Sequence, residues 1–387
     1  MKQRILIFYD HFYPSYKAGG PTQSLVNLVR ELYEVYDFYV VCKPHEMGDV
    51  ALLENIIADH WNNWEGKANV FYWQYGWSKK RVLQKLIQDI SPDVIYVNGL
   101  YSLYFNFLPL YYAKQLKSKR KALNIVLSTR GMLHPGALSQ KAGKKKIYLA
   151  LFRMLSIHRI VTWHATDDNE RNFIKMTMGE KMHVNVAANF PNLQSMSGSP
   201  DKQPGKLLLG TIALISPMKN HLEVLRALSQ VSTIIEWHIF GPVKDDVYWS
   251  NCQAMIRQLP PNIKVFYHGE LPPHLLAKAM ERFQVFIMPS KSENFGHAIV
   301  EALSAGKPVI TTTTTPFADL DLFGCGFALQ PEKLSEGLQE SIGKFAAMNE
   351  SEFSNAVSAT QKYIDQKIEK VSLKKAYYSL FNNSVHQ

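Results

Sequence analysis

Acidic residues are missing from one long part of this 387-residue sequence, residues 94–166. The stretch contains no Asp or Glu but twelve Lys and Arg residues, and without these the chain would carry 31 basic and 33 acidic side chains. The net charge of +10 therefore arises there. Such a field attracts nucleic acid, anionic lipid or a phosphorylated substrate, although a solvated basic helix explains it too. The twelve residues are Lys114, Lys117, Lys119, Arg120, Lys121, Arg130, Lys141, Lys144, Lys145, Lys146, Arg153 and Arg159.

Cysteine is also scarce, and the three thiols, Cys42, Cys252 and Cys325, are widely spaced. They form no zinc motif and indicate a reducing compartment. No run of eighteen uninterrupted apolar residues is present, and Lys2-Gln3-Arg4 leads directly into the strand-like segment Ile5–Tyr9. We therefore expect neither a membrane-spanning helix nor a cleaved signal.

Strand-like and helix-like segments alternate along the chain, which is typical of mostly parallel sheets covered by helices on both faces. The chain is longer than one hydrophobic core usually supports, so two domains are expected. Residues 190–206 contain three Pro, three Ser and two Gly and are predicted to be a linker between them. The expected strands are Arg4–Tyr9, Phe38–Cys42, Val70–Trp73, Val94–Asn98, Ile125–Thr129, Arg159–Ala165, His183–Ala187, Leu207–Ala213, Glu236–Phe240, Ile263–Tyr267, Val285–Met288, Val309–Thr313 and Gly326–Leu329.

The most informative segment, Phe286–Ile310, is predicted to be a strand, a polar loop, a helix and a second strand. Glu293 falls in the loop and Glu301 on the second turn of the helix. Ligands of open α/β sheets bind beyond the carboxyl ends of strands, with their anionic parts at helix N-termini. Glu293 could then lie beside a sugar, the amides near Phe295–His297 beside a phosphate, and Glu301 under a ribose. For two isolated carboxylates, a capping loop followed by a solvated glutamate is the better explanation.

The complete string of this segment is more specific than its two carboxylates. It resembles the signature of retaining glycosyltransferases of family 4, which have the two-Rossmann architecture called GT-B. The resemblance implies an N-terminal acceptor domain at residues 1–192, a nucleotide-sugar domain at 206–370, and a C-terminal helix within 371–387 that crosses back to the first domain. The residues that carry it are Pro289, Ser290, Glu293, Phe295, Gly296, Glu301, Ala302, Gly306, Pro308 and Val309.

The resemblance implies an enzyme that moves a sugar from a nucleotide-diphosphate sugar to an acceptor hydroxyl, with retention of the anomeric configuration and without a metal. The motif Asp319-Leu320-Asp321 has the form that other glycosyltransferases use for a divalent cation, but its place in the chain favours no metal site. The donor-binding residues that the resemblance implies are Gly19, Gly20, Ser216, Lys219, Glu270, Leu271, Glu293, Asn294, Phe295, Gly296, His297 and Glu301.

The leaving-group side of the expected site departs from the family. Lys219, near a helix start, would neutralise the diphosphate, but the arginine that usually lies five residues earlier is Leu214 here. Arg130, in a loop after a strand, could fork onto a phosphate instead. Many family members have a histidine near this arginine, so His134 or His164 takes over that role, or neither does. We take Lys219, Glu293, Arg130 and His134 as the candidate catalytic residues.

Two further segments are weaker candidates. Gly19-Gly20, just before a helix expected from about Gln23 to Tyr33, lets the backbone approach a ligand closely, although a simple turn explains the pair equally well. His268-Gly269-Glu270-Leu271 matches the place where the family holds the nucleobase, mostly through backbone amides.

The basic stretch at residues 94–166 indicates what kind of acceptor the enzyme uses. A helix is expected over residues 102–116 and should pack on a sheet, so the aromatic residues near Tyr104 are expected in the core. Lys141–Lys146 suits an anionic membrane or an acceptor. We predict a cytoplasmic enzyme, peripheral at the inner face of the cytoplasmic membrane, acting on a glycan or lipid-linked acceptor in surface-polysaccharide or lipopolysaccharide synthesis. A sugar-nucleotide 2-epimerase of the same shape is one alternative. A hexose-phosphate or sucrose-type synthase is a second, but its small soluble acceptor would not need the basic stretch. A non-catalytic nucleic-acid-binding protein is another, but it leaves the Glu293–Glu301 string without a purpose, so we expect no nucleic acid.

Overall fold

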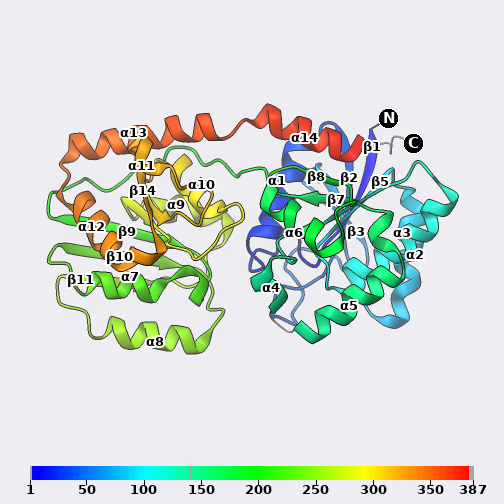
Figure 1. Cartoon of the computed structure of the whole chain (residues 1–387), viewed down its shortest axis with the longest axis horizontal. Coiled ribbons are helices and arrows are strands. Elements are labelled where there is room, and N and C mark those ends of the chain that lie inside the picture. Colours follow the sequence, from blue (N-terminus) through cyan, green and yellow to red (C-terminus); the bar gives the residue numbers. More distant parts are fainter. Residues whose placement is uncertain (1, 140–141, 383–387) are drawn as a thin grey trace. The chain divides into compact units, whose positions relative to one another are not determined.

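The computed structural model describes residues 2–139 and 142–382 and divides into two compact units (Figure 1). The first unit comprises the chain up to Phe190 together with the segment from Lys370 onward. The second comprises Pro191–Glu369. The chain therefore passes between the units twice.

The first unit is built on a sheet of order β3-β4-β2-β1-β5-β6-β7-β8, in which every pair is parallel except β3 and β4. Its strands are β1 (Gln3–Phe8), β2 (Tyr36–Cys42), β3 (Trp61–Trp64), β4 (Ala68–Tyr72), β5 (Val94–Asn98), β6 (Asn124–Ser128), β7 (Thr162–Ala165) and β8 (Val184–Val186). Its helices are α1 (Gly20–Leu32), α2 (Lys80–Ile90), α3 (Leu108–Lys119), α4 (Pro135–Ser139), α5 (Ala142–Met154), α6 (Asp168–Met178) and α14 (Lys370–Asn382).

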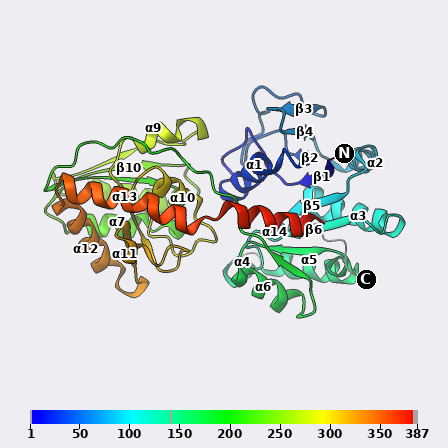
Figure 2. The ribbon, with the colours of Figure 1, turned by 90° about the horizontal axis from the view of Figure 1, so that it is seen from above.

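Both faces of this sheet are buried, as consecutive apolar residues in its strands predict. In β1, Ile5 and Ile7 pack with α1 and α14, whereas Leu6 and Phe8 pack with α2, α3, α5 and α6. Figure 2 shows α14 lying along the elements of the first unit, near β6. The last helix of the chain is thus part of the core of the first unit.

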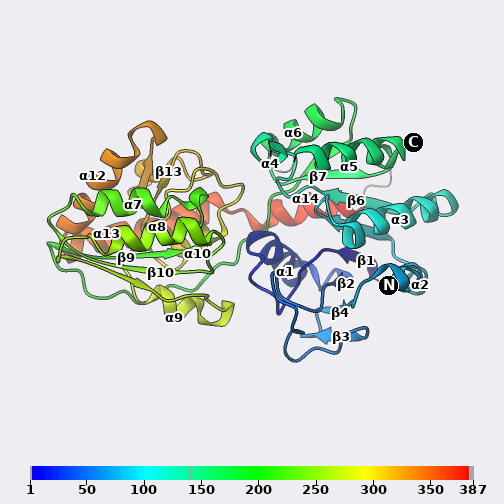
Figure 3. The same ribbon diagram turned by 90° about the horizontal axis from the view of Figure 1, so that it is seen from below.

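The second unit contains a parallel sheet of order β11-β10-β9-β12-β13-β14. Helices α7, α8 and α12 pack on one face and α9 and α10 on the other, while α13 contributes buried residues to both cores. Figure 3 shows α7 and α8 together. The strands are β9 (Lys206–Ile212), β10 (Ile234–Phe240), β11 (Ile263–Tyr267), β12 (Val285–Ile287), β13 (Val309–Thr312) and β14 (Gly326–Leu329). The helices are α7 (His221–Leu228), α8 (Asp246–Ile256), α9 (Leu276–Met280), α10 (His297–Ser304), α11 (Leu320–Phe323), α12 (Leu334–Ala347) and α13 (Glu350–Lys367).

The predicted α/β class and strand order along the chain are confirmed, with four local differences. The strand expected from Arg159 begins at Thr162, because Ile157–Arg159 forms a 3₁₀ turn. Strand β3 was not predicted because its centre, Asn62-Asn63, is polar; it is held as an edge strand by pairing with β4 and by the Trp61–Phe71 ring contact (5.3 Å). The helix expected from residue 102 begins as a π-helical turn, Leu103–Phe107. Helix α1 begins three residues earlier than expected, so Gly20 lies inside it.

Residues 191–205, which composition predicts to be a linker, contain no helix or strand but lie on the second unit; we call them the strap. The buried ammonium of Lys307 donates a hydrogen bond to the Gly198 carbonyl (2.8 Å), and Gln284 donates one to the Asp201 carbonyl (3.0 Å). Buried donors are costly to leave unpaired, so these bonds fix the strap in spite of its flexible composition.

Candidate functional site

The loop after β12 and the start of α10 have the arrangement that the sequence predicts. Gly296 precedes α10 with φ +73°, and a Cβ there would lie 2.9 Å from the Phe317 ring, so glycine is required on both grounds. No side chain caps the helix N-terminus. The amides of an uncapped first turn attract an anion, and this end of α10 therefore suits a phosphate.

Lys219 and Glu293 lie together. Lys219 ends a short turn after β9, Glu293 follows β12, and these two strands are neighbours in the sheet. The Lys219 ammonium donates a hydrogen bond to the Glu293 carboxylate, and both side chains are mostly buried. Two of the candidate catalytic residues thus form an ion pair at the carboxyl end of the sheet, where ligands of this class of fold bind.

Glu301 lies on the second turn of α10 and is 8% exposed. Burial raises its pKa to about 7, and a hydrogen bond from the side chain of Asn192 opposes that rise. The Asn192 Nδ2 to Glu301 Oε1 distance is 3.1 Å. Sequence inspection missed Asn192 because it lies 109 residues before its partner, in a segment without a motif.

The remaining donor-binding candidates near the Lys219–Glu293 pair are Ser216, Asn294, Phe295 and His297. Ser216 is buried and its carbonyl accepts from the Lys219 amide (3.0 Å), which closes the turn that carries the lysine. Asn294 is exposed, and the Phe295 and His297 rings are in contact (4.6 Å between centroids).

At the predicted nucleobase segment, the Gly269 carbonyl accepts from the Gly241 amide (2.7 Å), so the loops after β10 and β11 are joined. Glu270 is exposed and Leu271 packs partly against the core. Neighbouring His238 and His268 have stacked rings with Nδ1 and Nε2 2.9 Å apart. The segment therefore has a defined backbone, which is what recognition through amides requires.

The loop that ends at Gly19, before Gly20 begins α1, is organised by a carboxylate that the sequence did not indicate. Gly19 has φ +74° and is the N-cap of α1. Buried Glu46 accepts hydrogen bonds from the Ser15 hydroxyl (2.9 Å) and from the amides of Tyr16 (2.5 Å) and Lys17 (3.3 Å). These amides therefore face a carboxylate of the protein, and no sequence signal identified Glu46.

Arg130 is engaged by protein groups inside the first unit. Its guanidinium donates to Asn98 Oδ1 (2.9 Å), to the Tyr96 hydroxyl (3.0 Å) and to the side chain of Asn189. The Tyr96 hydroxyl is in turn 2.8 Å from Nδ1 of buried His164, whose Nε2 donates to a carbonyl. Burial and the charge of Arg130 lower the pKa of His164 to about 4, so the imidazole is neutral.

His134 is exposed, and its Nδ1 accepts from the Gly136 amide (3.1 Å) at the start of α4. The ring lies edge-on to Phe173, with 5.0 Å between centroids. The observed contacts are those of a helix-capping side chain.

The Asp319-Leu320-Asp321 motif is used within the second unit. Asp319 accepts from the Tyr363 hydroxyl and pairs with the Lys367 ammonium (3.0 Å). Within residues 2–139 and 142–382, no group of three or more His, Cys, Asp and Glu side chains could hold a metal ion.

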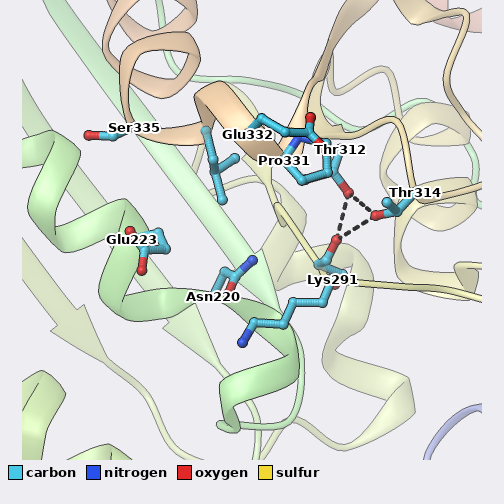
Figure 4. A pocket seen from close by; sticks show the side chains of 10 residues that line it. Asn220, Glu223, Lys291, Thr312, Thr314, Pro331, Glu332 and Ser335 are labelled. Carbon is cyan, nitrogen blue, oxygen red and sulfur yellow. Dashed lines mark hydrogen bonds between the residues drawn. The ribbon is translucent and has the colours of Figure 1, made fainter. Parts of the chain in front are cut away.

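A pocket of about 470 Å³ opens beside α7, lined among others by Asn220, Glu223, Lys291, Thr314 and Glu332 (Figure 4). The Thr314 hydroxyl donates to the Ser290 carbonyl at its wall (3.2 Å). Neither the Lys219–Glu293 pair nor Glu301 lines it, so this pocket is distinct from the predicted donor site.

The basic stretch forms an unusual surface on α5. Ile147, Leu151 and Met154 follow one another at helical spacing and are 73%, 38% and 74% exposed. Exposed Lys144 and Lys146 flank them, while Lys141 lies outside the described residues. Of the described helices, none is long and apolar enough to cross a membrane.

Most aromatic residues near Tyr104 pack in or against the core, as expected, but Tyr111 is 38% exposed. Phe105 is fully buried, and Tyr104 packs against Trp73 with 6.0 Å between ring centroids.

Residues 194–359 match a family model described as "Glycosyl transferases group 1". A relative from Xanthomonas campestris, GDP-mannose:cellobiosyl-diphosphopolyprenol alpha-mannosyltransferase, is 23% identical over 279 residues, which cover 71% of this chain and 70% of the relative.

Two solved structures share the fold. Sucrose-phosphate synthase from Thermosynechococcus elongatus has a TM-score of 0.72 at 14% identity, and the match covers 99% of this chain and 100% of that one. The Anabaena protein HepE, solved with UDP and glucose, has a TM-score of 0.68 at 18% identity, with 97% and 98% covered. The likeness confirms the predicted architecture of two Rossmann-like domains.

Proposed function

We propose that this chain, which has the GT-B fold and whose residues 194–359 match the group 1 glycosyltransferase model, transfers a sugar from a nucleotide-diphosphate sugar to the hydroxyl of a lipid-linked acceptor, with retention of configuration. The bond from the anomeric carbon to the phosphate oxygen breaks, and a bond to the acceptor oxygen forms on the same face. The acceptor proton passes to the departing phosphate. The observation that carries the proposal is the Lys219–Glu293 pair beside the uncapped N-terminus of α10.

Each group of this site has a task in the proposed reaction. The Lys219 ammonium compensates the charge that develops on the diphosphate, and the first amides of α10 bind a phosphate oxygen. Glu293 accepts hydrogen bonds from the donor sugar and keeps the lysine oriented. Glu301 accepts from the ribose hydroxyls.

The proposal needs no metal, because an ammonium and a helix N-terminus act where other glycosyltransferases use a cation. Turnover should be unchanged within twofold by millimolar EDTA. If EDTA lowered turnover and added Mg²⁺ or Mn²⁺ restored it, this part of the proposal would be contradicted.

Arg130 and His134 are left out of the proposed machinery. Three protein groups already accept from the Arg130 guanidinium, and His134 caps α4. We assign both residues to the structure of the first unit.

The proposal of a lipid-linked acceptor is based on the exposed surface of α5. An exposed apolar row flanked by lysines suits the interface of an anionic membrane, where apolar side chains enter the acyl boundary and ammonium groups meet headgroups. The diphosphopolyprenol-linked acceptor in the name of the Xanthomonas relative agrees with this choice. We propose that the enzyme works at the inner face of the cytoplasmic membrane in surface-polysaccharide or lipopolysaccharide assembly.

Vesicle sedimentation tests the membrane part. Phosphatidylglycerol vesicles at low salt should retain the protein, and the triple change Ile147→Ser, Leu151→Ser, Met154→Ser should release it. Val371→Ser, an exposed apolar residue of α14, is the matched control. If vesicles retained the triple variant as well as wild type, α5 would not be the membrane-binding surface.

The reaction is tested by incubation with GDP-mannose or UDP-glucose and a diphosphopolyprenol-linked glycan, with NMR of the product. An α-linked product from an α-linked donor supports retention. A β-linked product, or a changed sugar in the absence of acceptor, would contradict the proposed activity.

A further inference from the structure

The strap follows helix α10 closely. The Gln194 amide donates to the Ser304 hydroxyl (2.9 Å), and the Ser197 amide donates to the Ala305 carbonyl (3.1 Å). Both acceptors lie at the C-terminal end of α10. The Ser197 bond thus satisfies a carbonyl that the helix end leaves open, and the Gln194 bond attaches the strap to a side chain of the last turn.

Packing holds the same stretch from a second side. Gly306 has φ +80°, and a Cβ there would lie 2.7 Å from the Cε of Met196. The absence of a side chain at Gly306 therefore admits the strap, and the Lys307 bond to Gly198 secures it two residues further on. Gly306 is one of the signature residues, and its observed role is to make room for this contact.

At its start, the strap carries Asn192 to Glu301. Asn192 Nδ2 donates to Glu301 Oε1 over 3.1 Å. Among residues 2–139 and 142–382, no other side-chain hydrogen bond to this carboxylate occurs. Each carboxylate oxygen has two lone pairs, so the Asn192 bond leaves room for two hydroxyl donors of a ligand.

We propose that Asn192 is a positioning residue for the donor site: fixed by the strap, its amide orients the Glu301 carboxylate for the two hydroxyls of a nucleotide ribose. This inference rests on the proposed function, because it takes a nucleotide sugar as the ligand of Glu301. It adds that the segment joining the two units is itself part of the donor site.

The charge state of Glu301 makes this contact consequential. Burial raises the pKa of Glu301 to about 7, the Asn192 bond lowers it, and no neighbouring charge contributes to the shift. Only the ionised carboxylate accepts two hydroxyl hydrogen bonds without donating one. Ribose binding should therefore strengthen as the pH rises through about 7, and loss of the Asn192 donor should move that rise to higher pH.

Two substitutions separate a positioning role from a structural one. Asn192→Ala removes the donor, and Asn192→Asp keeps the shape but places a second carboxylate beside the first. The midpoint of donor binding against pH should increase in the order wild type, Ala, Asp. If Asn192 has only a structural role, the midpoint pH of donor binding should change less in Asn192→Asp than in Asn192→Ala, because Asp is the closer isostere of Asn.

The affinities for GDP-mannose and UDP-glucose are measured by calorimetry from pH 6 to 9. Asn192→Ala should weaken binding about threefold to tenfold at pH 7, as expected for one hydrogen bond to a carboxylate, and less at pH 9. Gln194→Ala is the matched control, because Gln194 bonds to α10 through its backbone. The Glu301 carboxyl is also titrated directly by ¹³C NMR, with Glu301→Gln to assign its resonance.

The outcomes distinguish the inference from the proposed function. An unchanged Glu301 titration in Asn192→Ala overturns the inference, whether or not a donor binds. If Glu301→Gln weakens donor binding but Asn192→Ala does not, only the inference fails. If Glu301→Gln leaves donor binding unchanged, Glu301 is not a donor ligand, and the site proposed above fails with it.

Discussion

The loop after β12 and the loop after β6 look alike in the sequence, yet their charged side chains have different surroundings. Both follow a buried parallel strand, and they carry Glu293 and Arg130 respectively. Glu293 has one ion-pair partner, Lys219, near an uncapped helix N-terminus. Arg130 has three acceptors within its own unit. A charged side chain at the carboxyl end of a strand can thus bind a ligand. Whether it is available depends on the protein groups that already bond to it.

Lys219→Ala should have the largest effect. Loss of one preorganised donor to a developing negative charge costs about 100-fold to 1,000-fold in turnover. Steady-state kinetics with the vesicle-bound acceptor measures it, and Lys219→Arg is the control that keeps the charge. Turnover within fivefold of wild type in the alanine variant would mean that the second-unit pair is not the catalytic one.

Arg130→Met should affect stability and not donor binding. It leaves three buried polar groups without their donor, which costs about 2–4 kcal/mol. Urea unfolding of the first unit gives this value, and calorimetry should give donor affinities equal to wild type. Weaker donor binding with unchanged unfolding would reverse the contrast between the two loops.

Glu301→Gln should stabilise the protein at alkaline pH. A carboxyl whose pKa rises to about 7 on folding binds more protons in the folded state, so its destabilising effect grows as the pH rises from about 4.5 to 7. The variant should be about 1–3 kcal/mol more stable than wild type at pH 8.5 and similar at pH 4.5. Thermal unfolding at the two pH values measures this; equal melting temperatures at pH 8.5 would contradict the raised pKa.

His134→Ala should have the smallest effect. Loss of the bond to the Gly136 amide costs at most about 1 kcal/mol, and turnover should stay within twofold. A tenfold loss of turnover at unchanged stability would return His134 to the candidate catalytic residues.

Local patterns in the sequence predicted most of the fold. Consecutive apolar residues with intervening helical segments predict parallel strands, and the string from Pro289 to Val309 predicts the loop of Glu293 and the helix of Glu301. Strand β3 was missed because its residues alone have little strand character and depend on β4.

The site was predictable only where its members are close in sequence or belong to a motif. Asn192 meets Glu301 across 109 residues, and Glu46 meets Ser15 across 31. Each is a single polar residue in a segment without periodicity, so only the folded chain brings it to its partner. Arg130 is the opposite case, a residue that the sequence predicted as catalytic. The sequence of its loop does not reveal the three acceptors that its guanidinium meets in the folded chain.

The central claim is that the second unit holds the donor through Lys219, Glu293 and Glu301. Calorimetric titration of wild type and of Glu301→Gln at pH 8 with GDP-mannose and UDP-glucose tests it most directly. We predict that one of the two binds wild type and that the variant binds it about 10-fold to 100-fold more weakly, as expected for charge-assisted hydrogen bonds. Equal affinity of the two proteins for that donor would contradict the account.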